Sequence, residues 1–378
     1  MKLLFWISVA VILYAYIGYP LAVWIMARLF ASRVSKASIT PRVSVVVACH
    51  NEALRIQSRI ENLLQSDYPA DRMEIIIVSD GSTDETEKLA RRFESETLRV
   101  FASDERRGKP SALNLGVAQA QGEIIVFADA RQRFEADAIK HLASNFNDPS
   151  VGVVSGELII EADSSIGEGV GLYWKYEKWI RKNESLSGSV VGATGAIYAI
   201  RRNLWKPLPA ETLLDDVYTP MQIALSGWRV VFDERARAID QASSSAGREF
   251  RRKARTLTGN YQLCQLMPRL LLPTSRLLFQ FYSHKLMRLA APIFFVTLFM
   301  SNLLIAGRTE SIAEAIFYQS SLALQIFFYA SLPLSRWLAK RNHRVRLLNA
   351  AYMFSVMNAA AIVGLFYFLR SKRNVWVK

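Results

Sequence analysis

The sequence predicts an α/β domain, built on an open and mostly parallel sheet, with membrane-spanning helices at both ends of the chain. Two runs rich in Val and Ile, residues 43–47 and 74–78, are typical of strands buried on both faces of a parallel sheet. Stretches with helical periodicity follow these runs, so strands and helices alternate as in an α/β fold. Residues 3–27 contain no charged side chain and are long enough to span a bilayer.

The other elements of the domain are predicted from the same signals. Apolar residues on one side of residues 54–64 indicate the helix after the first strand. In the turn 79–87, Ser82 or Thr83 can cap the next helix, and acidic residues suit its positive N-terminal end. A proline in the first turn is typical of the helix that begins near Lys109. Further strands are expected at residues 98–102, 123–130, 151–160 and 190–202, a helix at 171–185, and an acidic turn, a helix and a strand within 211–236.

Three more stretches near the C-terminus are uncharged and long enough to cross a membrane: residues 289–307, 315–334 and 347–369. Residues 261–288 mix Leu and Phe with basic residues and are broken by two prolines, a pattern typical of helices on a membrane surface. We therefore expect an N-terminal transmembrane helix (1–30), a soluble domain (40–260), interfacial amphipathic helices (261–288), about three transmembrane segments (289–370) and a basic tail (371–378).

The first apolar segment could instead be a cleaved signal peptide. It is longer than the apolar core of such peptides, and no convincing small-x-small cleavage site follows it. We therefore favour a membrane anchor.

The formal net charge of +14 lies largely beside the apolar segments. Basic residues follow the first segment and also lie within residues 336–346, and the positive-inside rule places both groups in the cytosol. This distribution accounts for the charge without a nucleic-acid partner. We expect a multi-pass protein of a bacterial-type inner (plasma) membrane with a cytosolic domain. Three C-terminal crossings would put the basic tail outside, so either the tail breaks the rule or one late segment does not fully cross.

Disulfide, zinc and transport chemistry are not indicated. The two cysteines, Cys49 and Cys264, are not expected to pair in the cytosol. Neither has zinc-ligand spacing to a second Cys or to a His, apart from the uninformative neighbour His50. The apolar segments contain almost no ionisable residue, which argues against a transport pathway.

Acidic residues at predicted strand and helix ends are the main functional signal. Asp80 and Asp129 follow buried strands, where ligands bind in α/β sheets, and Asp215 and Asp216 begin a helix. Taken singly, each has a structural explanation in capping, turn formation or helix-terminal charge. The basic block 248–255 could likewise be a solvated helix face. Together these groups suit a nucleoside diphosphate, whose phosphates need metal ions, Arg or Lys, with one carboxylate left to act as a base.

Seven short motifs narrow the class further. No Walker loop or G-x-G-x-x-G motif occurs, so neither an ATPase nor a dinucleotide-dependent enzyme is supported. The motifs are, in order, ACHNE (48–52), SDGSTD (79–84), GKPSALN (108–114), FADAR (127–131), VGATGAIYAIRR (191–202), LDDVYT (214–219) and RKARTLTGNYQ (252–262). Together they resemble the motifs of membrane-integrated members of glycosyltransferase family 2, the group of cellulose, hyaluronan and poly-N-acetylglucosamine synthases. The resemblance implies a GT-A-type, Rossmann-like fold.

The resemblance also implies a nucleotide-sugar site. Glu52 would meet the nucleoside, Asp80 would contact the uracil and Lys109 would approach the diphosphate. Asp129 takes the first position of the family's D-x-D element, so it would help to bind the donor and a divalent cation, Mg²⁺ or Mn²⁺. Arg255 takes the place of the arginine in the Q-x-x-R-W element and would stabilise the leaving nucleoside diphosphate.

On the acceptor side, the resemblance assigns the general base to Asp216, the last residue of the element that the family writes as T-E-D. Gly195 belongs to the glycine-containing segment that lines the acceptor site. Asp215 and Arg252 would also lie on the acceptor side.

The sequence departs from the family pattern in the metal-binding element. Arg131 replaces the second aspartate of D-x-D. Either a metal binds through Asp129, diphosphate oxygens and water, which we favour, or Arg131 takes over part of the cation's role.

Two acceptor-side elements also differ. Leu214 and Asp215 replace the threonine and glutamate of T-E-D, and Arg252 and Thr256 replace the glutamine and tryptophan of Q-x-x-R-W. In the synthases that tryptophan stacks on the acceptor sugar. Its loss, and the small number of C-terminal segments, argue against long-chain polymerisation.

The expected function is that of a membrane-bound inverting glycosyltransferase. It would move a sugar from a nucleotide-sugar donor, UDP-linked by resemblance, to a glycan or lipid acceptor in polysaccharide or exopolysaccharide synthesis. One alternative is a lipid-directed transferase that makes a glycolipid or a polyprenyl-linked sugar. The other is a non-catalytic nucleotide-sugar-binding protein, against which a retained base at Asp216 argues.

Overall fold

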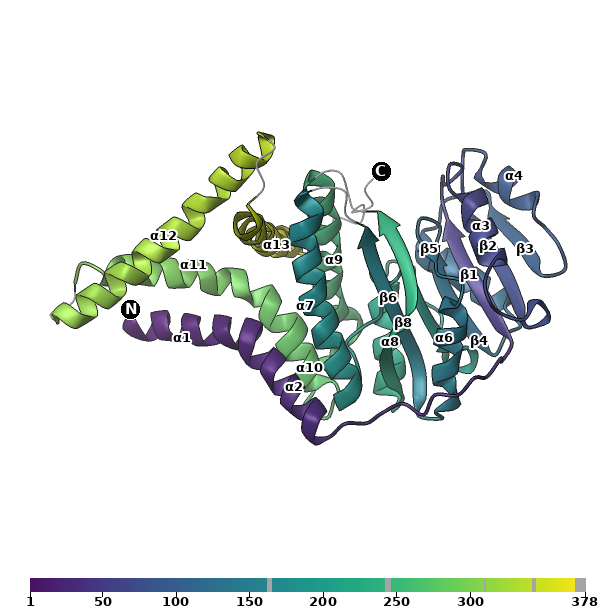
Figure 1. Ribbon diagram of the computed structural model, residues 1–378, viewed down its shortest axis with the longest axis horizontal. Helices are drawn as coiled ribbons and strands as arrows, with labels where there is room; N and C mark the ends of the chain where they lie inside the picture. Colours follow the sequence, from purple (N-terminus) through teal and green to yellow (C-terminus); the bar gives the residue numbers. More distant parts are fainter. Residues whose placement is uncertain (162–164, 242–245, 309–310, 342–344, 371–378) are drawn as a thin grey trace.

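The computed structural model describes residues 1–161, 165–241, 246–308, 311–341 and 345–370. An α/β domain lies at one end of the molecule and a group of long apolar helices at the other (Figure 1). Two helices, α7 (Ser165–Ser187) and α9 (Ala246–Leu266), lie between these two parts. The expected basic tail, residues 371–378, lies outside the described residues.

One eight-stranded mixed sheet forms the centre of the domain, in the order β3-β2-β1-β4-β7-β6-β8-β5. The first four strands are parallel to one another, as their continuous apolar runs predict. Strand β7 lies antiparallel between β4 and β6, β8 is parallel to β6, and β5 is an antiparallel edge strand. The strands are β1 (Val43–Cys49), β2 (Met73–Asp80), β3 (Leu98–Ser103), β4 (Ile124–Asp129), β5 (Arg133–Phe134), β6 (Val151–Glu161), β7 (Ile197–Arg201) and β8 (Arg229–Gln241).

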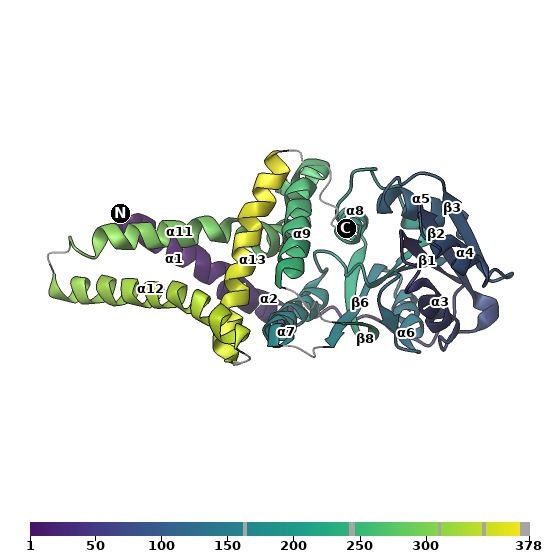
Figure 2. The same cartoon turned by 90° about the horizontal axis from the view of Figure 1, so that it is seen from above.

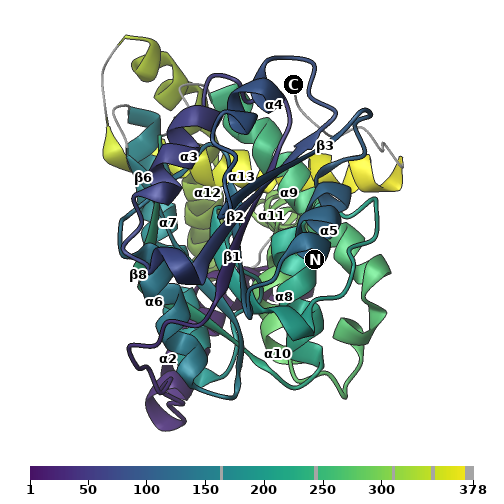
Figure 3. The same ribbon diagram turned by 90° about the vertical axis from the view of Figure 1, so that its right-hand side faces the viewer.

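Helices cover both faces of this sheet. Along β1, Val45 and Val47 belong to the core on one face, while Val46 belongs to the core on the other. Figure 3 shows α3 and α5 on opposite sides of β2. The predicted fold class, a mostly parallel α/β sheet with membrane-type helices at both ends of the chain, is therefore confirmed. The covering helices are α3 (Ile56–Leu64), α4 (Thr86–Arg91) and α6 (Ala138–Ser144) on the first face, and α5 (Lys109–Gln119) and α8 (Asp215–Leu225) on the second.

Within the described ranges of the chain, four helical stretches are long and apolar enough to cross a membrane. Figure 2 shows that α1, α11 and α12 follow a similar direction, whereas α13 lies across them and alongside α9. The stretches are Lys2–Leu29, Leu278–Ile305, Ile312–Ser335 and Leu348–Leu369. They contain α1 (Lys2–Leu13), α2 (Tyr19–Leu29), α10 (Leu278–Gln280), α11 (Met287–Ile305), α12 (Ile312–Lys340) and α13 (Arg346–Leu369).

The segment expected to lie on the membrane surface, residues 261–288, is divided in the structure. Its start forms the end of α9, and a short turn of helix, Pro268–Leu271, follows. The helix that begins at Leu278 then continues through Ile305. The second apolar stretch is therefore longer than the uncharged run indicated, because it includes Lys285 and Arg288.

Candidate active site

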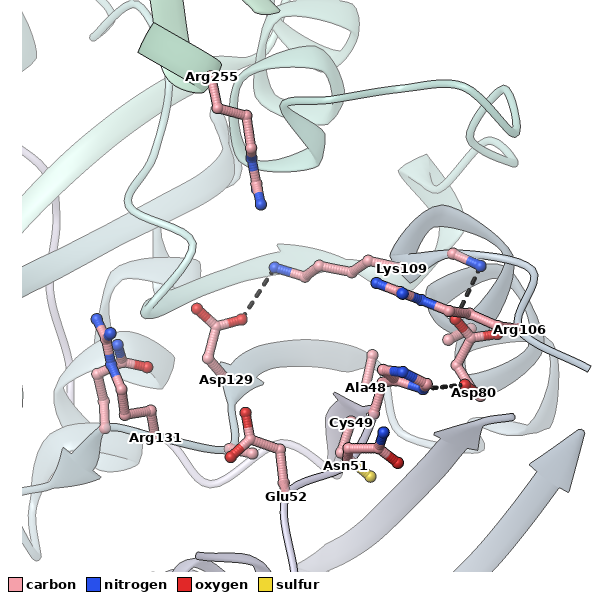
Figure 4. A pocket seen from close by; sticks show the side chains of 15 residues that line it. Ala48, Cys49, Asn51, Glu52, Asp80, Arg106, Lys109, Asp129, Arg131 and Arg255 are labelled. Atoms are coloured by element: carbon pink, nitrogen blue, oxygen red, sulfur yellow. Dashed lines mark hydrogen bonds and ion pairs between the residues drawn. The ribbon is translucent and has the colours of Figure 1, made fainter. Parts of the chain in front are cut away.

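A cavity of about 760 Å³ opens at the carboxyl ends of β1, β2 and β4 (Figure 4). We call it the first cavity. The residues expected to bind a nucleotide sugar all line it: Glu52, Asp80, Lys109, Asp129 and Arg255. Three of them come from strand ends or the turn after a strand, Lys109 begins α5, and Arg255 reaches in from α9. The parallel strands thus bring together side chains that are far apart in the sequence.

Asp80 shapes the loop that leads into α5. Its two carboxylate oxygens accept hydrogen bonds from the backbone N–H groups of Arg107 and Gly108, each at 2.8 Å. Gly108 has a φ of +91°, a conformation that favours glycine. Asp80 is buried, so these bonds fix the loop against the end of β2. Arg106 on the same loop also lines the first cavity, and the motif reading did not single it out.

The turn after β1 is held by side chains from the turn after β2. Asn51 has a φ of +55°, and its Oδ1 accepts the N–H of Thr83 at 2.8 Å. The N–H of Glu52 donates to Oγ1 of Thr86 at 2.7 Å. The Glu52 carboxylate pairs with Arg55 at 2.9 Å, so it lies beside the cavity without being buried.

Lys109 lies at the centre of an acidic cluster. Its Nζ is 2.9 Å from Oδ1 of Asp129 and 3.4 Å from Oδ2 of Asp215. Burial lowers the pKa of Lys109, but Asp129, Asp215 and Asp216 outweigh burial and raise that pKa above its ordinary value. Lys109 therefore stays positively charged between the carboxylate of Asp129 on β4 and the carboxylates of Asp215 and Asp216 on α8.

Asp216 has the electrostatics of a general base. Its Oδ2 accepts the N–H of Gly195 at 2.8 Å. Burial and the neighbouring Asp215 raise its pKa to about 6, despite the opposing effect of Lys109. A Cβ atom at position 195 would come within 3.1 Å of Oδ2, so glycine allows this close approach. The carboxylate is ionised at neutral pH and still basic enough to take a proton.

Arg131 lines both cavities, but its guanidinium already has a partner in the protein. Its guanidinium forms an ion pair with Asp240 of β8, and Nε2 of Gln132 donates to the same carboxylate at 3.0 Å. No sequence pattern pointed to Asp240, because only the strand order of the sheet brings β8 close to Arg131. This pairing speaks against Arg131 as a replacement for a metal ion. Asp129 presents one carboxylate to the first cavity, and among the described residues no group of three His, Cys, Asp or Glu side chains surrounds a possible metal position.

A second cavity, of about 440 Å³, joins the first at Lys109, Asp129 and Arg255. The residues expected on the acceptor side line this second cavity and not the first: Gly195, Asp215, Asp216 and Arg252. Its walls come from α7, α8, α9, α11 and α13. The structure therefore places the expected donor and acceptor residues in two joined cavities.

A buried polar network lies beside the second cavity, and two of its members, Glu177 and Arg288, line that cavity. Glu177 of α7 pairs with Arg288 and, at 3.1 Å, with His284. The other ring nitrogen of His284 lies 2.7 Å from Glu184, to which Tyr19 also donates. Burial raises the pKa of Glu177, but Arg288 and His284 hold it well below its usual range. The network links the first apolar stretch, α7 and α11.

Comparison with known proteins agrees with this geometry. Residues 44–206 match the family described as Glycosyl transferase family 2. This matched segment is similar to a glycosyltransferase family 2 domain and covers less than half of the chain. The resemblance drawn from the seven motifs is thereby confirmed, and the match covers β1 to β7.

Curated relatives of the chain include poly-β-1,6-N-acetyl-D-glucosamine synthases from Staphylococcus aureus (strain COL) and Staphylococcus epidermidis. Each is 25% identical over 228 residues, which is 58% of this chain and 55% of the relative. The chain thus matches about half the length of these relatives. Among solved structures, it resembles a mannosyltransferase from Pyrobaculum calidifontis in complex with GDP-Man and Mn²⁺, with a TM-score of 0.75, 23% identity, and coverage of 98% of this chain and 99% of that one.

Proposed function

We propose that the chain is a membrane-bound inverting glycosyltransferase that uses a nucleotide sugar and a glycan or lipid acceptor. One observation carries the proposal: the two cavities meet at Lys109 and Asp129, and Asp216 lines only the second. A donor in the first cavity would place its diphosphate beside Lys109. An acceptor in the second cavity would reach the donor past Asp216. This arrangement suits attack from the side opposite the leaving group.

In the reaction, the acceptor hydroxyl gives its proton to the carboxylate of Asp216. The hydroxyl oxygen forms a bond to C1 of the donor sugar as the bond from C1 to the phosphate oxygen breaks. Lys109 and Arg255 stabilise the negative charge that grows on the leaving nucleoside diphosphate. An α-linked donor would give a β-glycoside.

Asp129 would hold a divalent cation together with the diphosphate oxygens. When bound, the cation supplies positive charge to the leaving group. The chain's own part is to present one carboxylate, to keep Lys109 beside it and to keep Arg131 paired with Asp240. The Mn²⁺ in the P. calidifontis structure is compatible with such a site.

The relatives named as poly-β-1,6-N-acetyl-D-glucosamine synthases support a role in polysaccharide synthesis. The mannosyltransferase that shares the fold binds GDP-Man. A donor screen should therefore include both UDP- and GDP-sugars. The cytosolic face of a plasma membrane is the expected location, because that is where nucleotide sugars are available to an inner-membrane enzyme.

The proposal is tested with the purified full-length chain, membrane lipids and a panel of UDP- and GDP-sugars. The Asp216→Asn substitution removes the base, so release of nucleoside diphosphate should fall by roughly a hundredfold or more. Asp71→Asn is the matched control, because Asp71 is exposed and lies in neither cavity. Its rate should equal that of the wild type.

Nucleotide binding separates the proposed enzyme from a binding protein. If wild type and Asp216→Asn bind nucleoside diphosphate equally and neither releases it from any donor, the chain is a nucleotide-sugar-binding protein. If both release it at the same rate, another group is the base.

A further inference from the structure

The second cavity has a strong excess of positive charge. Among the described residues that line it, eight are basic and four are acidic. Five of the basic residues line this cavity and not the first: Arg181, Arg252, Lys253, Lys285 and Arg288. Three of the four acidic groups are already engaged, since Asp129 and Asp215 lie 2.9 Å and 3.4 Å from Lys109 and Glu177 pairs with Arg288. The donor diphosphate needs none of these five cations, because Lys109, Arg106 and Arg255 line its own cavity.

Two of these cations are not neutralised by the part of the protein that the structure describes. Lys285 and Arg181 are half-buried, and neither has an ion pair or side-chain hydrogen bond there. The positive charges of Lys285 and Arg181 lie close enough to repel each other. The acidic groups near Lys285 are Glu177, Glu184 and Asp216. Glu177 and Glu184 are shared with Arg288 and His284. Withdrawing charged groups from water without partners is unfavourable, so this arrangement is suited to an anionic ligand.

The same cavity has an apolar side formed by the membrane-type helices. Phe354, Met357 and Ala361 of α13 line it, together with Tyr16 of the first apolar stretch. Lys285 and Arg288 belong to the second of these stretches. Three of the four candidate spans therefore contribute to a cavity that also contains Asp216. A ligand that satisfies all these walls has an apolar chain, an anionic group and a hydroxyl.

We infer that the acceptor is an amphiphile whose head group carries a phosphate or diphosphate as well as the attacking hydroxyl, such as a sugar joined through phosphate to an apolar chain. This inference rests on the proposed function and names its acceptor. The phosphate binds Lys285 and Arg181, and the chain lies against α13. The hydroxyl meets Asp216, which takes its proton, while the phosphate of the acceptor stays intact.

The acceptor class is tested with three compounds that contain the same sugar. They are decyl diphospho-N-acetylglucosamine, the uncharged decyl glycoside of N-acetylglucosamine, and N-acetylglucosamine 1-phosphate without a chain. Binding to the full chain in detergent is measured by calorimetry, and transfer is measured with the donor found active in the screen. We expect the first compound to bind at least about tenfold more tightly than either of the others, because only it uses both the cations and the apolar wall.

Substitutions then locate the phosphate. Lys285→Gln and, independently, Arg181→Gln should raise the KM for decyl diphospho-N-acetylglucosamine about tenfold and leave the KM for the uncharged glycoside within about twofold. Lys206→Gln makes the same chemical change at an exposed residue outside both cavities and should change neither value. Two separate variants protect the test against a folding defect in one of them.

Three outcomes would overturn the inference. Equal use of the charged and uncharged decyl compounds would show that the cations do not select the acceptor. Preference for the sugar 1-phosphate without a chain would indicate a free phosphate-bearing sugar. Unchanged KM values in both variants would place the phosphate elsewhere. The proposed function fails separately, if the wild type binds the charged lipid as expected but consumes no nucleotide sugar with any acceptor.

Discussion

Asp216 shows how one position acquires a chemical role from its surroundings. An aspartate in water is almost fully ionised near pH 5 and is a weak base. Here burial and the adjacent Asp215 raise the pKa of Asp216 to about 6, while the N–H of Gly195 holds one of its oxygens in place. The side chain is thereby prepared to accept a proton from a hydroxyl at neutral pH.

The raised pKa predicts the pH dependence of transfer. The proposed base works only when ionised, so kcat/KM should be constant above about pH 7 and should fall as the pH drops through about 6. The residual rate of Asp216→Asn should lack this acid limb. The check is a series of rate measurements between about pH 4.5 and about pH 8.5 at constant ionic strength, with roughly one measurement per half pH unit. A midpoint near the ordinary aspartate value would show that another group limits the rate.

Gly195 tests the geometry of the same site. In Gly195→Ala the new Cβ would lie 3.1 Å from Oδ2 of Asp216, so the carboxylate must move by a few tenths of an ångström. We expect kcat to fall roughly tenfold to a hundredfold, with the donor KM nearly unchanged, because Gly195 lines only the second cavity.

The matched control for this change is Gly307→Ala. No atom lies within 4 Å of a Cβ at position 307, so the substitution adds the same methyl group in open space. Equal losses in both variants would trace the effect to general destabilisation rather than to Asp216.

At the scale of elements, the loop between β3 and α5 forms part of the first cavity, where we propose that the donor binds. It carries Arg106 into the first cavity and starts the helix at Lys109. Asp80 holds this loop through two backbone N–H groups. Asp80 of the motif SDGSTD therefore positions this loop, in addition to any contact that it makes with the uracil of a donor.

Asp80→Asn tests this positioning role. One of the two acceptor oxygens becomes an NH₂ group that faces a backbone N–H, so a buried donor loses its partner at a cost of about 1–3 kcal/mol in stability. We expect a lower melting temperature and a donor KM raised roughly tenfold. Asp104→Asn on the same exposed loop segment is the control and should change neither quantity. A raised donor KM with an unchanged melting temperature would instead favour direct nucleotide contact.

At the scale of the whole molecule, α7 and α9 lie between the sheet domain and the long apolar helices (Figure 1). α13 packs along α9 and lies across α1 and α11 (Figure 2). If α1, α11 and α12 cross the bilayer, α13 lies along its surface. That arrangement would end the conflict between three C-terminal crossings and the basic tail, since the chain after α13 would return to the side of the sheet domain.

Cysteine accessibility tests this topology. In a variant without Cys49 and Cys264, single cysteines replace Leu54 on the domain, Gly307 after α11 and Arg370 after α13. We expect a membrane-impermeant reagent added to intact cells to label only position 307. Labelling of position 370 in intact cells would mean that α13 crosses the membrane. Labelling of position 54 would place the domain outside.

The sequence by itself determined the parallel half of the sheet, the apolar stretches and the grouping of Asp80, Lys109 and Asp129. These features depend on local patterns, because a buried parallel strand is apolar throughout and ligands bind at its carboxyl end. The motif order was also enough to identify the family. It could not supply strand direction, so the antiparallel insertion of β7 between β4 and β6 was not predicted.

Only the tertiary structure decided which charges meet. Arg131 follows Asp129 by two residues, yet its partner is Asp240 on a strand that is distant in sequence. Lys285 and Arg288 seemed to belong to a surface helix, but they line the second cavity beside Asp216. Electrostatic interactions act through space over several ångströms, and a one-dimensional pattern records only the distance along the chain. For that reason motifs could predict the residues around the first cavity, whereas the cations of the second cavity, where we propose that an anionic acceptor binds, come together only through the packing of α7, α9, α11 and α13.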